Sequence, residues 1–297
     1  MMRIPPDLAL TLAAVIDEGT LDAAARRLRV TPSAVSQRIK TLEEQLGRVV
    51  LVRSKPARLT DAGAAVVRMA RQIALLEHDA LAGLGDDAAA RTTVPLAVNA
   101  DSLATWFLDP LARLAERHPV VFELHRDDQD FTAGLLESGT VMGAVTSRER
   151  PVAGCRVSPL GAMRYEAVAT PAFAAEWMPD GADPAALAIA PLVDFDRRDD
   201  LQTRWLRTHG VDQTVPPRNF VPASSDFAAA VRAGLGWGML PRFQSAQALG
   251  DGALVLLGGP PLDVPLYWQQ WNLRSPLLDA IADEIVTEGR RVLRSAA

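Results

Sequence analysis

The sequence LDAAARRLRVTPSAVSQRIKTLEE, residues 21–44, contains two short helical patterns that meet at a tight turn. The turn falls at Arg29 and Val30, and Thr31 is a suitable N-cap for a helix whose first residue is Pro32. Proline is tolerated there because the N–H that it lacks would have no partner in the first helical turn. The stretch therefore predicts a helix-turn-helix unit.

The second of these helices has two different faces at about 100° per residue. Its apolar face would pack on the helices Leu8–Ile16 and Leu21–Leu28, the first of which ends at Gly19. That face consists of Val35, Ile39, Leu42 and Leu46. The opposite face is free to enter a groove of DNA and consists of Ser33, Ser36, Gln37 and Lys40.

The side chains of the polar face suit base recognition, because Gln pairs with adenine, Lys with guanine, and Ser with either bases or phosphates. The alternative is an ordinary amphipathic surface helix, which also has a polar face. Two features of the sequence favour a DNA-binding helix over an ordinary surface helix. A basic segment broken by Pro56, from Arg53 to Arg58, follows like a wing along a phosphate backbone. Residues 1–60 contain 10 Lys and Arg against 6 Asp and Glu, a net charge of +4, whereas the other 237 residues contain 21 against 30, a net charge of −9.

Length and composition limit the remaining classes. A chain of 297 residues that is 48% hydrophobic predicts two or three domains. The sequence contains no apolar run of membrane-spanning length and no signal peptide, so we expect a cytoplasmic protein without a membrane partner. The single cysteine, Cys155, excludes an internal disulfide, and the four histidines lack metal-ligand spacing. We expect neither a metal nor a cofactor.

A continuous helical pattern follows from Asp61 to about Gly83. Its apolar positions alternate spacings of three and four, as in the seam of a coiled coil. The seam predicts dimerisation, and a two-fold dimer would place two recognition helices about one DNA turn apart, or a multiple of it. Packing on its own chain is the alternative. The residues predicted to dimerise are Val66, Met69, Ile73 and Leu76.

From Thr93 onward, strand and helix signals alternate, including a helix Leu103–Arg117 and a strand Tyr165–Ala169. This alternation predicts an α/β domain with a mostly parallel sheet. Ligands of such sheets bind where strands end and helices begin. Two helix starts are rich in hydroxyl and acid groups, Asp101-Ser102 and Ser224-Ser-Asp226. If they face each other across a cleft, they would bind a carboxylate, and a nearby acid would bind an ammonium or guanidinium group. The alternative is that these side chains only cap helices. The acids considered are Asp101, Asp127, Asp128, Asp194 and Asp196.

The sequence shows no set of catalytic residues. It contains no nucleophile elbow, no Walker loop and no dinucleotide-binding glycine motif. We therefore expect a protein that is not an enzyme.

Several of these stretches resemble LysR-type transcriptional regulators. The resemblance rests on residues 23–28, residues 33–43, Leu46-Gly47 and the run RLTDAG at 58–63, and it covers nearly the whole chain. LVRSKPAR at 51–58 and AVNADSLATW at 97–106 look more narrowly like the ArgP/LysG branch. That branch responds to lysine and arginine and typically activates a basic-amino-acid exporter gene.

The resemblance implies an all-α winged helix-turn-helix domain (1–60), a linker and dimerisation helix (61–87), and an α/β effector domain of two lobes, similar to type 2 periplasmic binding proteins. Lobe I would be 92–163 plus 267–297, and lobe II would be 164–266. Family DNA contacts fall on Ser33, Ser36, Gln37 and Lys40, with Arg53 and Arg58 on the wing. The candidate effector contacts are Asn99, Asp101, Ser102, Asp128, Thr146, Asp194 and Ser224.

The chain departs from many family members at Ala100, where they carry serine at the first effector position. This moves the expected carboxylate contact to Ser102. We expect a transcriptional regulator that binds double-stranded DNA and senses lysine, arginine or both, as a homodimer or tetramer. RNA polymerase is a candidate partner. The alternatives are a ligand-independent repressor or architectural DNA-binding protein and, with little support, an enzyme carrying a DNA-binding appendage.

Overall fold

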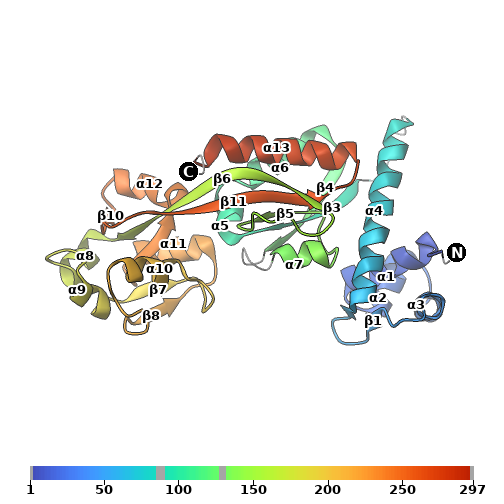
Figure 1. Cartoon of the computed structure of the whole chain (residues 1–297), viewed down its shortest axis with the longest axis horizontal. Coiled ribbons are helices and arrows are strands. Elements are labelled where there is room, and N and C mark those ends of the chain that lie inside the picture. The colour runs from blue at the N-terminus through green and yellow to red at the C-terminus, as the bar shows by residue number, and fades with distance from the viewer. Residues whose placement is uncertain (1–2, 85–90, 127–131, 295–297) are drawn as a thin grey trace. The chain divides into compact units, whose positions relative to one another are not determined.

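The computed structural model describes residues 3–84, 91–126 and 132–294 (Figure 1). Tertiary contacts divide the chain into two units. The first contains 1–98, 111–157 and 268–284, and the second contains 99–110, 158–267 and 285–297. Within the described ranges, no helix has the length and apolar character that crossing a membrane requires.

The N-terminal module of the first unit is a helix-turn-helix followed by a short hairpin. Thr20 and Thr31 cap the second and third helices by accepting hydrogen bonds from the N–H groups of Ala23 and Ala34, at 3.2 and 3.1 Å. Arg29, with φ of 54°, ends the second helix in the left-handed region and makes the tight turn. The predicted cap at Thr31 and the predicted turn are confirmed, and Thr20 is a cap that the sequence did not predict. The elements are α1 (Pro6–Glu18), α2 (Leu21–Leu28), α3 (Pro32–Leu46), β1 (Leu51–Val52), β2 (Arg58–Leu59) and α4 (Asp61–Gly83).

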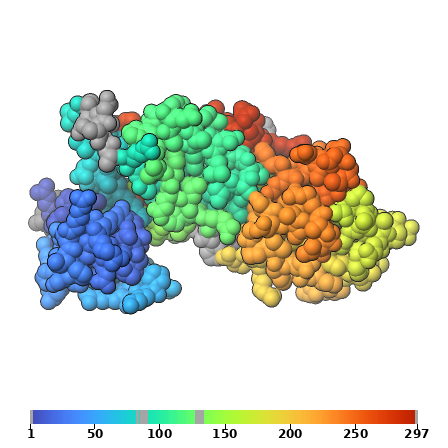
Figure 2. All heavy atoms as spheres, turned by 180° about the vertical axis from the view of Figure 1, so that it is seen from behind, coloured from blue at the N-terminus to red at the C-terminus, as the bar shows by residue number. Residues whose placement is uncertain are grey.

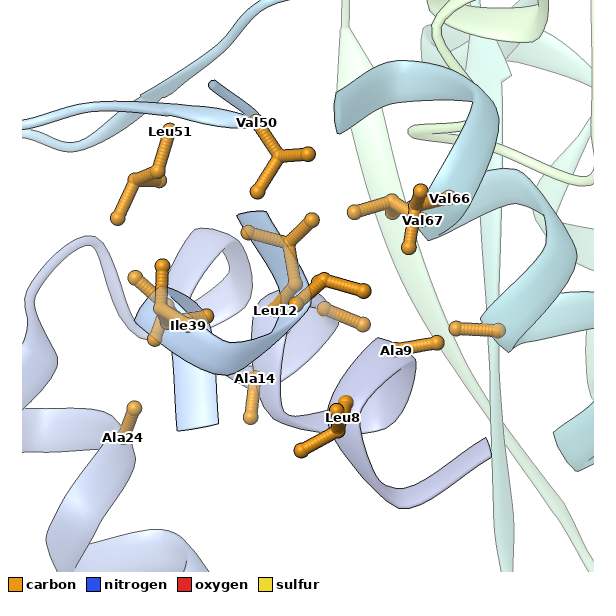
Figure 3. Close-up of a cluster of buried hydrophobic side chains, with 14 of the residues drawn as sticks. Leu8, Ala9, Leu12, Ala14, Ala24, Ile39, Val50, Leu51, Val66 and Val67 are labelled. Atoms are coloured by element: carbon orange, nitrogen blue, oxygen red, sulfur yellow. The ribbon is translucent and has the colours of Figure 1, made fainter. Parts of the chain in front are cut away.

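One apolar core joins all of these elements. Figure 3 shows Leu12 of α1, Ile39 of α3 and Val50 pointing toward a common centre, with Val66 and Val67 of α4 beside them. The predicted inner face of α3 is confirmed, because Val35, Ile39 and Leu42 are at most 1% exposed. Burying such a face stabilises the fold, by about 25 cal/mol of free energy for each Å² of apolar surface removed from water. The polar face of α3 is thereby left outside.

The hairpin and α4 approach each other closely at Gly63. A Cβ atom at this position would lie 2.0 Å from the carbonyl oxygen of Val50. Thr60 joins the same elements, because its hydroxyl donates to Val49 O at 2.8 Å and accepts from Gly63 N at 3.1 Å. Glycine is therefore required where the hairpin meets the long helix.

Helix α4 extends over the predicted length, but its apolar positions differ in exposure. Val66 is 4% exposed inside the core of the N-terminal module, and Met69 packs partly against that core. For Val66, packing within its own chain is therefore what the structure shows. Farther along, Ile73 is half-buried and Leu76 is 43% exposed.

Two arginines of α4 also bind the segment after α7. Arg71 donates to the carbonyl oxygens of Gly139 and Thr140 and to the carboxylate of Asp17 in α1. Arg68, one turn earlier, donates to Leu136 O at 3.0 Å. These contacts tie the helix to both α1 and the turn that precedes β5.

The rest of the first unit is built on parallel strands. The central strand β3 pairs with β4, Thr92 opposite Val120, and with β5, Leu96 opposite Gly143. Strand β11 lies next to β5 in the strand order. Helix α13 is held to α6 by Glu284, which binds Arg113 and Arg117. The elements are β3 (Thr92–Val98), α6 (Leu108–Arg117), β4 (Val120–Arg126), α7 (Thr132–Glu137), β5 (Gly143–Thr146) and α13 (Pro276–Val292).

The second unit combines a long antiparallel strand with a short parallel pair. Strand β6 pairs antiparallel with β9 and β10, and β7 pairs parallel with β8. The yellow and orange residues of this unit form one continuous mass in the space-filling view (Figure 2). The elements are α5 (Ala100–Thr105), β6 (Cys155–Ala169), α8 (Pro171–Trp177), α9 (Pro184–Ile189), β7 (Leu192–Asp194), α10 (Leu201–Thr208), β8 (Arg218–Phe220), α11 (Ser224–Arg232), β9 (Gly238–Pro241), α12 (Arg242–Gly250), β10 (Val255–Leu256) and β11 (Leu262–Trp271). Strands β6 and β11 each continue into the first unit.

The α/β class is confirmed, with three corrections. The sheet is mixed, because β9 and β10 run antiparallel to β6 in the second unit. The expected single helix Leu103–Arg117 is two helices, α5 and α6. Pro110 explains the break, since its ring would clash with the carbonyl four residues earlier, at Trp106. Finally, β6 begins ten residues before the expected start at Tyr165.

The contact at Gly63 gives a stability prediction. Gly63→Ala should lower the free energy of unfolding by at least about 1–3 kcal/mol, because the new methyl meets a backbone carbonyl that cannot rotate away. Urea unfolding of the full chain, followed by circular dichroism, measures this change.

The matched control is Gly134→Ala in α7, where an added Cβ meets nothing within 4 Å. This variant should be neutral or slightly stabilising, because alanine has the higher helix propensity. Equal stability of the two variants would contradict the proposed role of Gly63.

Candidate functional site

The outer face of α3 presents the predicted polar side chains. Ser33, Gln37 and Lys40 are exposed, and Ser36 is half-buried. Lys40 lies 3.7 Å from Glu44 in an exposed ion pair. Such a pair contributes little to stability, so the ammonium group can exchange it for a phosphate or a base.

The hairpin β1–β2 forms the predicted wing. Leu51 pairs with Leu59 and Val52 with Arg58, and the hydroxyl of Ser54 donates to Pro56 O at 2.6 Å across the loop. Arg53 and Arg58 are both exposed. The geometry brings the six candidate DNA contacts to the surface of one module, and their individual roles stay predictions.

A second polar site lies in the second unit and is centred on Asp101 in the first turn of α5. Ser224 of α11 donates to Asp101 Oδ1, and Tyr165 of β6 donates to Asp101 Oδ2, each at 2.6 Å. Gln244 of α12 in turn donates from Nε2 to Ser224 Oγ at 2.9 Å. Two elements, β6 and α11, therefore donate to the carboxyl group carried by α5, and α12 joins the network through Ser224.

Burial determines the electrostatics of this carboxyl group. Loss of solvent raises the pKa of Asp101, and the hydrogen bonds from Ser224 and Tyr165 lower it in part. Among the residues that the structure describes, no Arg, Lys or His forms an ion pair with Asp101. The hydrogen-bond donors to Asp101 among the described residues are neutral hydroxyl groups, so none of them would balance the charge of an ionised Asp101.

The other predicted acids of this unit already have cationic partners. Arg218 donates to Asp194 Oδ2, and Arg198 lies 3.1 Å from Asp196 Oδ2. Burial raises the pKa of Asp194, against the effect of Arg218. Because Asp194 already forms an ion pair with Arg218, it is a poorer candidate than Asp101 for binding the cationic group of a ligand.

Asp199 is an acid that the sequence did not single out. Its carboxyl group accepts from the N–H groups of Leu201 and Phe195, at 3.1 and 3.3 Å. Burial raises the pKa of Asp199 to about 6, and the charges of Asp194 and Asp101 add to that rise. Three acids thus influence one another within the second unit, and Arg218 neutralises one of them.

The alternative that these hydroxyl groups only cap helices is not what the structure shows. The N-cap of α5 is Asn99 and that of α11 is Ala223, and neither makes a side-chain capping bond. Ser224 is the first helical residue and its hydroxyl is directed to Asp101. Ser102 is fully buried in α5, and its hydroxyl has no partner among the described residues. Both polar side-chain atoms of Asn99 are likewise buried without a partner in the described chain.

Two further candidates fall elsewhere. Thr146 is buried at the end of β5 in the first unit, where its hydroxyl accepts from Arg148 N at 3.1 Å. Asp128 lies outside the described residues, as does Asp127. Among the described candidate effector contacts, the structure therefore joins only Asp101 and Ser224 by a hydrogen bond. Asn99 and Ser102 lie on either side of Asp101 in the sequence.

Sequence reasoning missed Tyr165 and Gln244. Tyr165 belonged to an expected strand, but nothing local indicated that its hydroxyl would meet Asp101. Gln244 lies in α12, a helix that the sequence did not predict. Among the described residues, no cluster of three or more His, Cys, Asp or Glu side chains is arranged to hold a metal ion.

Comparison with known proteins places the chain in a family. Residues 7–64 match the bacterial regulatory helix-turn-helix protein model of the lysR family, and residues 88–290 match the LysR substrate binding domain model. The HTH-type transcriptional regulator LysG of Mycobacterium tuberculosis is 49% identical over 94% of this chain and 91% of its own length. The lysine export transcriptional regulatory protein LysG of Corynebacterium glutamicum is 42% identical over 96% of this chain and 97% of its own.

A solved structure agrees with these sequence matches. Full-length LysG from Corynebacterium glutamicum with bound effector Arg superposes with a TM-score of 0.78 at 40% identity, covering 98% of this chain and 99% of that one. These relatives are regulators and not enzymes. With both domain models matched and identity sustained over nearly the full length, the chain belongs to the LysR family of DNA-binding transcriptional regulators.

Proposed function

We propose that this regulator senses a basic amino acid, lysine or arginine, and controls a gene for a basic-amino-acid exporter. The relatives support the proposal by name, since one is a lysine export regulator and one was solved with bound arginine. The observation that carries it in this chain is the buried carboxyl group of Asp101, which has hydroxyl donors but no cationic partner among the described residues.

A cationic ligand suits Asp101 for an electrostatic reason. A charge in a poorly solvated environment interacts more strongly with an opposite charge than it would in water. An ammonium or guanidinium group would supply the counter-charge that the described residues do not, and both oxygens of Asp101 retain further acceptor capacity. Asp194 and Asp196 lack this property because Arg218 and Arg198 already bind them.

The carboxylate of the effector needs donors, and the unpartnered groups of α5 are the best candidates. Ser102 Oγ and Asn99 Nδ2 are buried and make no hydrogen bond in the described chain. Leaving such groups unpaired costs about 1–3 kcal/mol each, which a ligand would recover. Ser224 is less suited than expected from sequence, because its one hydroxyl proton is directed to Asp101.

On the DNA side, α3 would enter the major groove and the wing would contact phosphates. The DNA-binding domain would be 1–60 and the linker helix 61–87. Lobe I of the effector domain would be 92–163 with 267–297, and lobe II would be 164–266. The exposed part of α4, including Ile73 and Leu76, would pair two chains in a homodimer or tetramer. Effector binding would shift the population between two arrangements of the DNA-binding modules. We expect the protein to act in the cytoplasm, with RNA polymerase as a candidate partner.

The face of α3 gives a DNA-binding prediction. Gln37→Ala should weaken binding to the operator about 5- to 100-fold, because one bidentate base contact contributes about 1–3 kcal/mol. Mobility-shift titration at fixed salt, with one DNA fragment that the parent binds, measures the change. Gln45→Ala, an exposed glutamine near the end of the same helix, is the matched control and should bind as the parent does. Equal affinities for both variants would remove Gln37 from the interface.

The charge of Asp101 gives an effector prediction. Asp101→Asn should lower the affinity for arginine and lysine by about 10- to 100-fold, because a charge-assisted hydrogen bond becomes a neutral one. Calorimetric titration of the full chain with the twenty amino acids provides the measurement, and the parent should respond to lysine, arginine or both.

Asp109→Asn, an exposed acid in the first turn of α6, is the control and should leave affinity unchanged. Unaltered binding by Asp101→Asn would remove Asp101 from the site. A parent chain that binds no amino acid, and DNA binding that ignores them all, would favour a ligand-independent repressor or architectural protein.

A further inference from the structure

Gln244 and Tyr165 have no role in the function proposed above, yet both belong to the network around Asp101. Gln244 Nε2 donates to Ser224 Oγ at 2.9 Å, Ser224 Oγ donates to Asp101 Oδ1 at 2.6 Å, and Tyr165 donates to Asp101 Oδ2 at 2.6 Å. The chain of hydrogen bonds begins at an amide and ends at a carboxyl group.

The amide fixes the direction of that chain. An amide nitrogen donates and does not accept, so Ser224 must use an oxygen lone pair toward Gln244. Its one proton is then left for Asp101. With Tyr165 donating to the other oxygen, both oxygens of Asp101 act as acceptors, as an ionised carboxylate requires. Both O–H···O distances of 2.6 Å fall in the range typical of hydroxyl bonds to a charged carboxylate.

The same cluster has acceptor capacity that no described residue uses. Gln244 Oε1 is buried and has no hydrogen-bond partner in the described chain. Near Asp101, the donors of the network are neutral and its unused atoms are acceptors. A group with several N–H donors, such as an ammonium or guanidinium group, has the chemistry that this arrangement lacks.

We propose that Gln244, through Ser224, and Tyr165 are positioning residues that keep Asp101 an ionised acceptor for the cationic group of the effector. This inference rests on the proposed function and extends it to two residues outside the predicted site. Neither needs to touch the effector. Each acts by directing a proton toward Asp101 and so by disfavouring protonation of that carboxyl group.

The charged groups around the network define its pH dependence. Tyr165 lies on β6, Ser224 on α11 and Gln244 on α12, and Asp199 interacts with Asp101 through space from the segment before α10. Asp194 interacts with Asp199 and is paired with Arg218. Since Asp199 itself titrates near pH 6, the informative quantity is the difference between each variant and the parent.

The test is arginine and lysine affinity of the full chain, measured by calorimetry from pH 5 to pH 8 for the parent, Gln244→Met and Tyr165→Phe. Removal of either donor raises the pKa of Asp101 further, so more of it is protonated at a given pH. We expect affinity at pH 6 to fall about 3- to 10-fold, in keeping with the loss of one hydrogen bond. We also expect the fall in affinity at low pH to begin at a higher pH than in the parent, with recovery toward pH 8.

Gln247→Met, an exposed glutamine one turn along α12, is the matched control and should follow the parent at every pH. Circular dichroism and operator binding without effector show that each variant is folded, and Tyr165→Phe preserves the test if Gln244→Met does not fold. A pH profile identical to the parent, or an equal loss at all pH values, overturns the positioning role. A parent that binds neither amino acid overturns the proposed function itself, which is a separate result.

Discussion

The carboxyl group of Asp101, desolvated and without a cationic partner among the described residues, is the constraint on which the proposed effector site depends. Moving an ionised carboxylate away from water costs several kcal/mol, and hydrogen bonds from neutral hydroxyls return only part of that cost. The chain nevertheless directs Tyr165 and Ser224 toward Asp101. These contacts join β6, α5 and α11, so the packing of three elements includes an electrostatic deficit. A bound cation would reduce that deficit, which is how a small ligand can stabilise one arrangement of a large domain.

The neighbouring acids show why position matters more than composition. Asp194 and Asp196 have the same side chain as Asp101, but each of them forms an ion pair with an arginine. Asp199 is satisfied differently, by backbone N–H groups, and is the group whose pKa rises to about 6. Of these four acids, Asp101 alone lacks both a cation and backbone donors among the contacts described here. The proposed preference of the site for a cationic ligand rests on that difference.

The sequence predicted those parts of the fold that are determined locally. Thr31, Pro32 and the apolar spacing of α3 define a helix without reference to the rest of the chain, and the structure confirms it. The sequence brought the helix starts at Asp101 and Ser224 together, but Tyr165 and Gln244 could not be predicted. Tyr165 is 64 residues from Asp101, and Gln244 joins the network only by bonding to Ser224 through tertiary packing. The expected helix Leu103–Arg117 failed for a local reason that was visible, since Pro110 forbids a helical bond to Trp106. The capping roles failed because Ser224 makes a tertiary bond in place of a local one.

Because of the close contact at Gly63, the wing and α4 would move together as one rigid body. Because the Val50 carbonyl, the Thr60 hydroxyl and the first turn of α4 are in direct contact, a rotation of the helix carries the hairpin with it. A helix of 23 residues is about 34 Å long at 1.5 Å per residue. If the helix tilted by about 10° around its far end, the end beside the hairpin, and Arg53 and Arg58 with it, would move by about 6 Å. The angle of one helix, rather than any change within the DNA-binding module, would then be enough to move its register on the duplex.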